Sequence, residues 1–271
     1  MAYSAHKTIT SIVTGEELKE AFSRLGVTSG MVVEVHSSLS ALDYVVGGAQ
    51  TLNDVLIDLI SYEGTIVMPL QDVDNTDPSG WKSPRAEHSL HQMIRDALPA
   101  YHRKESDSRK MGAVADNFRR REGVVTSFSP SSAYGAWGKY ARIICERQPL
   151  HFPLGEASPT SHLYDLDGYV LLIGVGYESA TVLHLAEYRT DCRPIKINGS
   201  KVSTPEGDKW VRYLDLDIDS SSFTKVRQRM AAKNMIRETN LGGCHIQFFS
   251  AVNAIDEAEK MFEQSVYELY R

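Results

Sequence analysis

A histidine and a glutamate, His184 and Glu187, stand three residues apart in the stretch 180–189. Residues with this spacing share one face of a helix, so the two side chains are expected to meet. Histidine exchanges a proton near neutral pH, and a neighbouring carboxylate raises its basicity and fixes its tautomer. The pair therefore indicates a general base held by an acid. On spacing alone, a half-buried histidine beside a surface glutamate is an equally good interpretation.

The elements around this pair favour a site at the end of a strand. The apolar run 169–173 predicts a buried strand, and Gly174-Val175-Gly176 closes it. Thr181 is a plausible cap for the helix that carries His184. In an open α/β sheet, a helix that begins beyond the carboxyl end of a strand is a usual place for a site.

The first part of the chain predicts a strand-helix-strand unit. Thr14 and Glu17 fit a capping box that begins a first helix. Strands are expected at 31–36 and 65–69, with a helix opened by Thr51 between them. This order is typical of parallel strands joined by a right-handed crossover.

The remainder predicts more helices, a hairpin and a late strand. Helices are expected at 113–121, 133–147 and 220–233 and after a cap at Asn253, and a strand at 245–250. Asn198-Gly199 between short candidate strands is a strong hairpin signal, and 210–214 is expected to extend that small sheet. No linker, repeat or low-complexity tract divides the chain, so residues 1–271 are expected to form one domain with a hairpin-bearing C-terminal part.

The composition limits the partners. A net charge of -6 argues weakly against a nucleic-acid surface and leaves cationic small molecules as ligands. The three cysteines are widely spaced without a CxxC pair, so neither a metal site nor a disulfide framework is signalled. We find no secretory signal and no apolar run long enough to span a bilayer, so a cytoplasmic protein without a membrane partner is expected. A homodimer is a reasonable expectation by base rate.

The segment 71–85 has no apolar period and contains Asp72, Asp74 and Asp77. A loop of this length inside a compact domain is often functional. Its carboxylates would suit a cationic ligand, and a solvated acidic loop explains them equally well.

Two other chemistries have weaker signals. The pattern of Gly174 and Gly176 lacks the third glycine of a dinucleotide fingerprint, because Ser179 stands in its place. Ser37 or Ser38, after a strand, would suit a hydrolase nucleophile, but no G-x-S-x-G elbow is present. The same serine turn would equally suit phosphate binding through backbone N–H groups.

Several stretches, taken in order, resemble the antibiotic N-acetyltransferase family, typified by aminoglycoside 3-N-acetyltransferases. They are 35–39 with 47–48, 64–69, 77–78 with 81, 99–101, 109 with 111–112, 151–156 with 158–159 and 163–164, 170–176, and 184–189. The similarity runs over roughly residues 10 to 265. Each motif alone is weak, and their joint order is specific.

The resemblance implies an enzyme that uses acetyl-coenzyme A to acetylate an amine, typically the 3-amino group of a 2-deoxystreptamine ring, and so gives antibiotic resistance. It implies a layered α/β fold on a mixed sheet with helices on both faces, distinct from the commoner acetyltransferase fold. By position, His184 matches the family's catalytic histidine and Glu187 its acidic neighbour. The residues that match its cofactor-contacting segments are His36, Ser37, Ser38 and Leu39, and Arg109, Met111 and Gly112.

Carboxylates are needed to bind a polycationic acceptor, and Asp72, Asp74, Asp77 and Glu156 are the candidates. Asp72 is also a second candidate, beside Glu187, for holding the catalytic imidazole. These assignments rest on composition and loop position.

Two departures from the family pattern leave the acceptor open. Lys110 stands where a glycine is usual, and Ser129-Pro130 stands where many members have His-Pro. The lysine would either add a phosphate contact or distort the turn, should a positive φ be required. A related acetyltransferase acting on another small amine or a phosphonate-type metabolite is therefore the second interpretation. A non-catalytic antibiotic-binding protein is the third.

Overall fold

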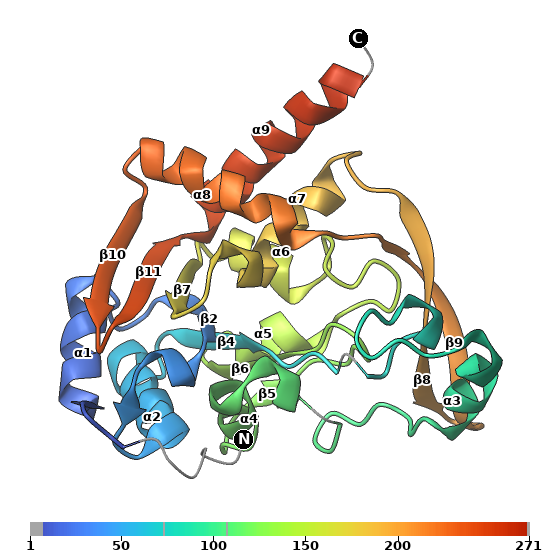
Figure 1. Ribbon diagram of the computed structural model, residues 1–271, viewed down its shortest axis with the longest axis horizontal. Helices are drawn as coiled ribbons and strands as arrows, with labels where there is room; N and C mark the ends of the chain where they lie inside the picture. The colour runs from blue at the N-terminus through green and yellow to red at the C-terminus, as the bar shows by residue number, and fades with distance from the viewer. Residues whose placement is uncertain (1–7, 73, 107, 270–271) are drawn as a thin grey trace.

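A seven-stranded mixed sheet forms the centre of the protein, whose computed structural model describes residues 8–72, 74–106 and 108–269 (Figure 1). The side chains of Arg109 and of 267–269 lie outside that description. In the order β10-β11-β7-β2-β4-β6-β5, the strands β7, β2 and β4 run parallel, and the pairs on either side are antiparallel. Their bounds are β2 (Val32–Ser37), β4 (Thr65–Pro69), β5 (Val125–Thr126), β6 (Tyr134–Gly138), β7 (Tyr169–Ile173), β10 (Ile236–Leu241) and β11 (Cys244–Ser250).

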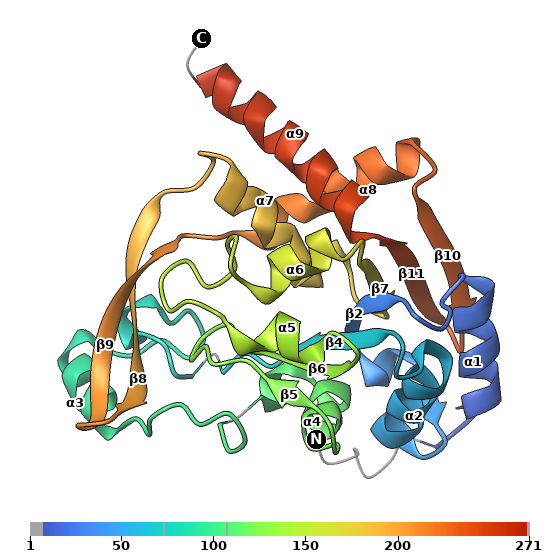
Figure 2. The ribbon, with the colours of Figure 1, turned by 180° about the vertical axis from the view of Figure 1, so that it is seen from behind.

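Helices cover both faces of this sheet (Figures 1 and 2). One face packs against α1 (Gly15–Arg24), α2 (Gly48–Ile60) and α4 (Ala113–Arg119). The other packs against α5 (Ala141–Glu146), α6 (Pro159–Asp165), α7 (His184–Arg189), α8 (Phe223–Ala232) and α9 (Ala251–Leu269). The layered α/β architecture with a mixed sheet is therefore confirmed. Among the described residues, no helix combines the length and apolar character that a bilayer span requires.

A long hairpin stands apart from the main sheet. It consists of β8 (Ile195–Thr204) and β9 (Gly207–Leu216), and α3 (His91–Ala97) lies beside it (Figure 1). A further small sheet pairs β1 (Ile12–Val13) with β3 (Tyr44–Val45). The hairpin-bearing C-terminal part is therefore present, as the sequence predicted.

The early elements agree with the sequence. Thr14 and Glu17 form the expected capping box at the start of α1. Strands β2 and β4 are parallel neighbours joined through α2, which confirms the strand-helix-strand unit.

Three predicted helix starts are wrong by a few residues. Helix α2 begins at Gly48, before Thr51, because Gly47 adopts the left-handed conformation at the cap. Thr181 opens a 3-10 turn, η6 (Thr181–Leu183), and its side chain caps nothing; α7 starts only at His184. Helix α9 starts at Ala251, ahead of Asn253.

The prediction of one helix over 133–147 is wrong, because its first part is strand β6. Tyr134 and Ala136 face one apolar cluster, and Trp137 packs against the cluster on the other side of the sheet. This alternation is the strand period. It is hard to recognise in the sequence because α5 follows after only two residues.

The hairpin turn was also misplaced. Asn198 and Gly199 lie inside β8, and the chain reverses at Pro205-Glu206, between the paired residues Thr204 and Gly207. A Cβ atom at Gly199 would lie 2.7 Å from the Trp210 ring. The glycine therefore makes room for a cross-strand indole, while the predicted strand 210–214 is confirmed within β9.

Candidate active site

Three segments predicted to be functional leave the same edge of the main sheet. Because β2, β4 and β7 are parallel, their carboxyl ends lie together. The turn that begins at Ser37, the last residue of β2, the acidic loop after β4, and the segment leading to His184 after β7 all start here (Figure 1). The backbone N–H of Ser38 donates to the carbonyl of Ile173 at 2.8 Å, which ties the first segment to the third.

Gly174 allows the close approach of two of these segments. Its φ is +64°, and a Cβ there would lie 2.4 Å from the Cβ of Ala41 and 2.9 Å from Sγ of Cys244. Only glycine fits such a position without strain. The glycine of the apparent dinucleotide pattern thus serves the packing of the strand ends.

The structure brings His184 and Glu187 together. Nδ1 of His184 lies 2.5 Å from Oε2 of Glu187, and the two residues are 9% and 0% exposed. An ionised carboxylate only accepts hydrogen bonds, so Nδ1 carries the proton and Nε2 is the basic nitrogen. The ring of Phe223 packs against the imidazole at a centroid distance of 4.9 Å. This arrangement can take a proton from a substrate amine.

The second oxygen of Glu187 has partners that the sequence did not reveal. Oε1 accepts from Nε of Arg193 and from the backbone N–H of Asp219 at 3.2 Å. Arg193 also donates from Nη2 to the carbonyl of Asp219 at 2.8 Å. The carboxylate is therefore held from both sides. No spacing rule indicates Arg193, because it lies beyond the end of α7.

The two predicted cofactor-contacting segments lie side by side. Gly112 has φ +93°, and its Cβ position would be 3.5 Å from the carbonyl oxygen of Ser37. The side chains of Leu39 and Met111 pack against the core on the α1 and α2 face. Nε2 of His36 lies 3.0 Å from Oε2 of Glu34, a buried residue that sequence reasoning missed.

Asp72 is buried at the start of the acidic loop. It accepts from the backbone N–H groups of Asp74 at 3.2 Å and Asn75 at 3.3 Å, as in an Asx turn. Asp72 was the alternative candidate for holding the imidazole of His184. In the structure, Nδ1 of that imidazole is bonded to Glu187.

Asn75 anchors the acidic loop to the hairpin and was not predicted. Its side chain exchanges two hydrogen bonds with the backbone of Lys201, at 2.8 and 3.0 Å. Its carbonyl accepts from the hydroxyl of Ser200 at 2.7 Å. A buried asparagine in a polar loop leaves no signal in the sequence.

Three of the carboxylates predicted to bind the acceptor already have cationic partners within the chain. The pairs are Asp74 with Lys110 (2.5 Å), Asp77 with Arg95 (2.9 and 3.2 Å) and Glu156 with Arg189 (2.6 and 3.2 Å). Burial alone would raise the pKa of Asp77, but the hydrogen bonds from Arg95 and Ser79 outweigh it and lower that pKa. An acceptor ammonium would have to displace these cations.

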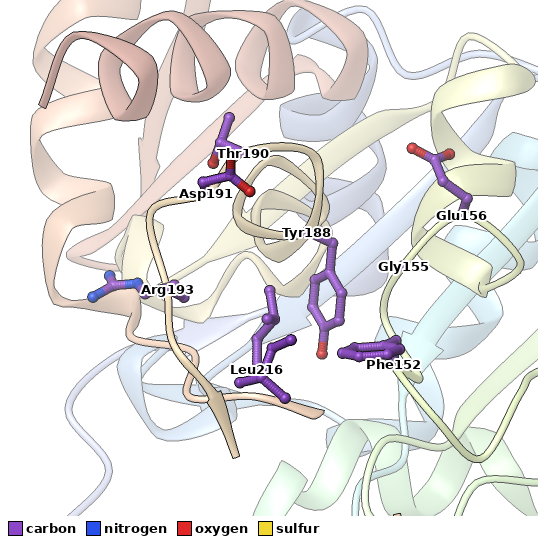
Figure 3. A pocket seen from close by; sticks show the side chains of 9 residues that line it. Phe152, Gly155, Glu156, Tyr188, Thr190, Asp191, Arg193 and Leu216 are labelled. Atoms are coloured by element: carbon purple, nitrogen blue, oxygen red, sulfur yellow. The ribbon is translucent and has the colours of Figure 1, made fainter. Parts of the chain in front are cut away.

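A pocket of about 400 Å³ lies beside the C-terminal end of α7 (Figure 3). Its lining residues are Phe152, Gly155, Glu156, Tyr188, Thr190, Asp191, Arg193, Ile195 and Leu216. The carboxylates of Glu156 and Asp191 stand at its rim, and Arg193 connects it to Glu187. Within the part of the chain that the structure describes, no group of three or more His, Cys, Asp or Glu side chains could hold a metal ion.

Comparison with known proteins identifies the family. The model of the aminoglycoside 3-N-acetyltransferase family matches residues 35–263. The chain belongs to this family. The resemblance drawn from the motifs is therefore confirmed, and with it the assignment to a family of acyltransferases.

Relatives and solved structures agree over nearly the whole length. The prophage-derived aminoglycoside N(3')-acetyltransferase-like protein YokD of Bacillus subtilis is 37% identical over 250 residues, 92% of each chain. Aminoglycoside N(3)-acetyltransferase VIII of Streptomyces fradiae is 28% identical, over 90% of this chain and 89% of its own. The crystal structure of YokD superposes with a TM-score of 0.92, 36% identity and 96% of each chain covered. The crystal structure of aminoglycoside acetyltransferase AAC(3)-Xa superposes with a TM-score of 0.84, at 26% sequence identity and with 94% of each chain covered.

Proposed function

We propose that the protein transfers the acetyl group of acetyl-coenzyme A to an aminoglycoside, at the 3-amino group of the 2-deoxystreptamine ring, and so gives resistance. The observation that carries the proposal is the buried pair of His184 and Glu187 at the carboxyl edge of the sheet. Family membership supports the reaction class. Solved structures of the same fold include AAC-IIIb with CoASH and AAC-VIa with sisomicin, and these bound molecules correspond to the two reactants proposed.

In the proposed mechanism, Nε2 of His184 removes a proton from the acceptor ammonium, because only the free amine attacks a thioester. The free amine adds to the thioester carbonyl to form the N–C bond and a tetrahedral oxyanion, and the C–S bond breaks as this intermediate collapses. Of the two protons that the nitrogen loses, one protonates the leaving thiolate and the other passes to solvent. Glu187 stabilises the imidazolium and keeps the ring oriented. Backbone N–H groups near Ser37-Ser38 are the proposed donors to the oxyanion.

The residues proposed to hold coenzyme A come from two adjacent segments. A Cβ at Gly112, whose φ is +93°, would lie in van der Waals contact with the carbonyl oxygen of Ser37. The proposed contacts are His36, Ser37, Ser38 and Leu39 from one segment, and Arg109, Met111 and Gly112 from the other. Acetyl-coenzyme A would supply the activated acetyl group.

A second candidate is an acetyltransferase whose acceptor carries fewer positive charges. The specific observation is that Asp74, Asp77 and Glu156 are each paired with a cation of the chain. A polycation gains less from carboxylates that are already neutralised. A panel of amines of increasing charge would separate the two candidates.

Thiol release from acetyl-coenzyme A tests the proposal. With an aminoglycoside present, the wild type is expected to release thiol, and His184→Ala is expected to lower kcat by roughly 10²- to 10⁴-fold. His162→Ala, on α6, is the control and should keep the wild-type rate. Release with small amines only would favour the second candidate. Unchanged turnover in His184→Ala would refute the mechanism, and drug binding without any release would indicate the non-catalytic interpretation.

A further inference from the structure

Glu34 is a carboxylate in the middle of the central strand. It lies on β2 with 0% exposure, opposite Val67 on β4 and Val170 on β7. Burying a charge among apolar neighbours costs several kcal/mol unless hydrogen bonds replace the lost water. The position of Glu34 therefore needs an explanation beyond packing.

Two donors and a ring nitrogen, from three different elements, lie against this carboxylate. The hydroxyl of Tyr134, on β6, donates to Oε1 at 3.1 Å. The backbone N–H of Val182, in η6, donates to Oε2 at 3.3 Å, and Nε2 of His36 lies 3.0 Å from the same oxygen. Burial and the charge of Glu34 hold the pKa of Tyr134 well above its usual value, so the phenol remains a donor. Glu34 therefore connects β2, β6 and the turn before α7.

The turn that Glu34 holds leads directly into the helix of the base. Val182 precedes His184 by two residues, and η6 runs into α7 without a break. The backbone nitrogen of Thr181 lies 3.4 Å from Nε2 of His36, so the imidazole of His36 packs against the same turn. His36 itself belongs to the segment proposed to contact coenzyme A.

We propose that Glu34 is a positioning residue for His184. Through the hydrogen bond from Val182 it fixes the turn that carries the base relative to β2, which leads into the segment proposed to bind the acyl donor. The inference rests on the proposed acyl transfer. Reacting groups held in place lower the barrier, and an error of about 1 Å in such a position can cost roughly 10²-fold in rate.

Two substitutions of Glu34 distinguish the position of its hydrogen-bonding oxygen from its negative charge. Glu34→Gln keeps an oxygen at the distance of Val182 and loses the charge. Glu34→Asp keeps the charge and withdraws both oxygens by about one C–C bond. We expect kcat to fall at least tenfold in Glu34→Asp and to stay within about threefold of wild type in Glu34→Gln. The KM for the acceptor amine should change little, because Glu34 contacts no substrate.

Tyr134→Phe provides an intermediate variant and Tyr177→Phe the control. The hydroxyl of Tyr134 bonds to Oε1 of Glu34 and also interacts with the side chain of Thr181 in the same turn, so Tyr134→Phe is expected to lower kcat, by less than Glu34→Asp. Tyr177 is 1% exposed and stacked on Phe249 at 4.5 Å, and its buried hydroxyl has no hydrogen-bond partner among the described residues. Tyr177→Phe should leave both kcat and stability unchanged.

Non-additivity distinguishes positioning from simple destabilisation. If Glu34 acts through His184, then Glu34→Asp should not slow the residual rate of His184→Ala any further. A full tenfold loss in that background, or wild-type kcat in Glu34→Asp, would overturn the proposal. Thermal unfolding of each variant reports whether the folded fraction is the same.

Amide hydrogen exchange at Val182, followed by NMR, tests the positioning without an acceptor. We expect faster exchange at Val182 in Glu34→Asp than in wild type, Glu34→Gln or Tyr177→Phe. Should the wild type acetylate no amine, the proposed function would fail, and this exchange would still decide whether Glu34 holds the turn. Equal exchange in all four proteins would overturn the inference.

Discussion

The charges around His184 and those around the acidic loop are stabilised in different ways. Glu187 and Glu34 are both 0% exposed, and each carboxylate meets partners from several elements. The side chains of Asp74 and Glu156 are 53% and 64% exposed, and each pairs with one cationic side chain, Lys110 or Arg189. Removing one partner of a buried pair costs about 3–5 kcal/mol, whereas an exposed pair contributes about 0–1 kcal/mol.

This difference suggests that the two groups of charges have different functions. Each buried carboxylate is held by partners from several elements, and so it suits the positioning of a base. The exposed pair of Asp74 with Lys110 is screened by salt, so an incoming ammonium can compete with Lys110. We therefore expect the buried charges to determine the reaction, and the exposed carboxylates to influence the choice of acceptor.

The largest expected effect comes from Glu187→Gln, which disrupts the hydrogen bonds of a buried carboxylate. Glu187 accepts from His184 with one oxygen and from Arg193 and Asp219 with the other. A glutamine has one oxygen, so its NH₂ group must face a donor on one side. We expect kcat to fall by roughly 10²- to 10⁴-fold, because the imidazole loses its tautomer or its anchor. Thiol-release kinetics measure this loss.

Glu63→Gln provides the comparison for that variant. Glu63 pairs with Lys139 on the surface, and its side chain is 74% exposed. This substitution should change neither kcat nor the folded fraction. Comparable losses in Glu63→Gln and Glu187→Gln would mean that the contrast between buried and exposed charges does not govern activity.

Much of the fold could be predicted because local patterns dominate it. Strands β4 and β7 are apolar runs buried almost throughout, and α1 begins with a capping box. Strand β6 and the true hairpin turn were missed, because tertiary contacts decide them: Trp137 packs across the sheet, and Gly199 makes room for Trp210.

The site divides in the same way. The pairing of His184 with Glu187 follows from helical spacing and was predicted. Glu34, Arg193 and Asn75 were not, because their partners lie far away in sequence or in irregular segments. Glu34 and Tyr134, for example, are separated by 100 residues and meet only when β2 and β6 enter the same sheet. Long-range pairs of this kind leave no periodic signal.

An intermediate effect is expected from Asp77→Asn, since Asp77 and Arg95 are each 23% exposed. The pKa of Asp77 is lowered in the folded protein, so its ion pair stabilises the fold at neutral pH and this contribution is lost as pH falls through the folded pKa. We expect Asp77→Asn to cost about 1 kcal/mol at pH 7, and the difference from wild type to shrink below about pH 4. Urea unfolding at pH 7 and pH 3 measures it. A deficit that stays constant with pH would show that the ion pair is not its cause.

The smallest effect is expected at the exposed pair, from Lys110→Met. Removing the lysine frees Asp74 for an acceptor ammonium, so the KM for a polycationic acceptor should fall by about two- to fivefold, with kcat unchanged. The gain should vanish at about 0.5 M salt, where exposed charges are screened. Lys139→Met, which removes a surface cation paired with Glu63, is the control. A rise in the KM for acetyl-coenzyme A would instead show that Lys110 contacts the acyl donor, and would group the lysine with the residues around His184 rather than with the exposed ion pairs.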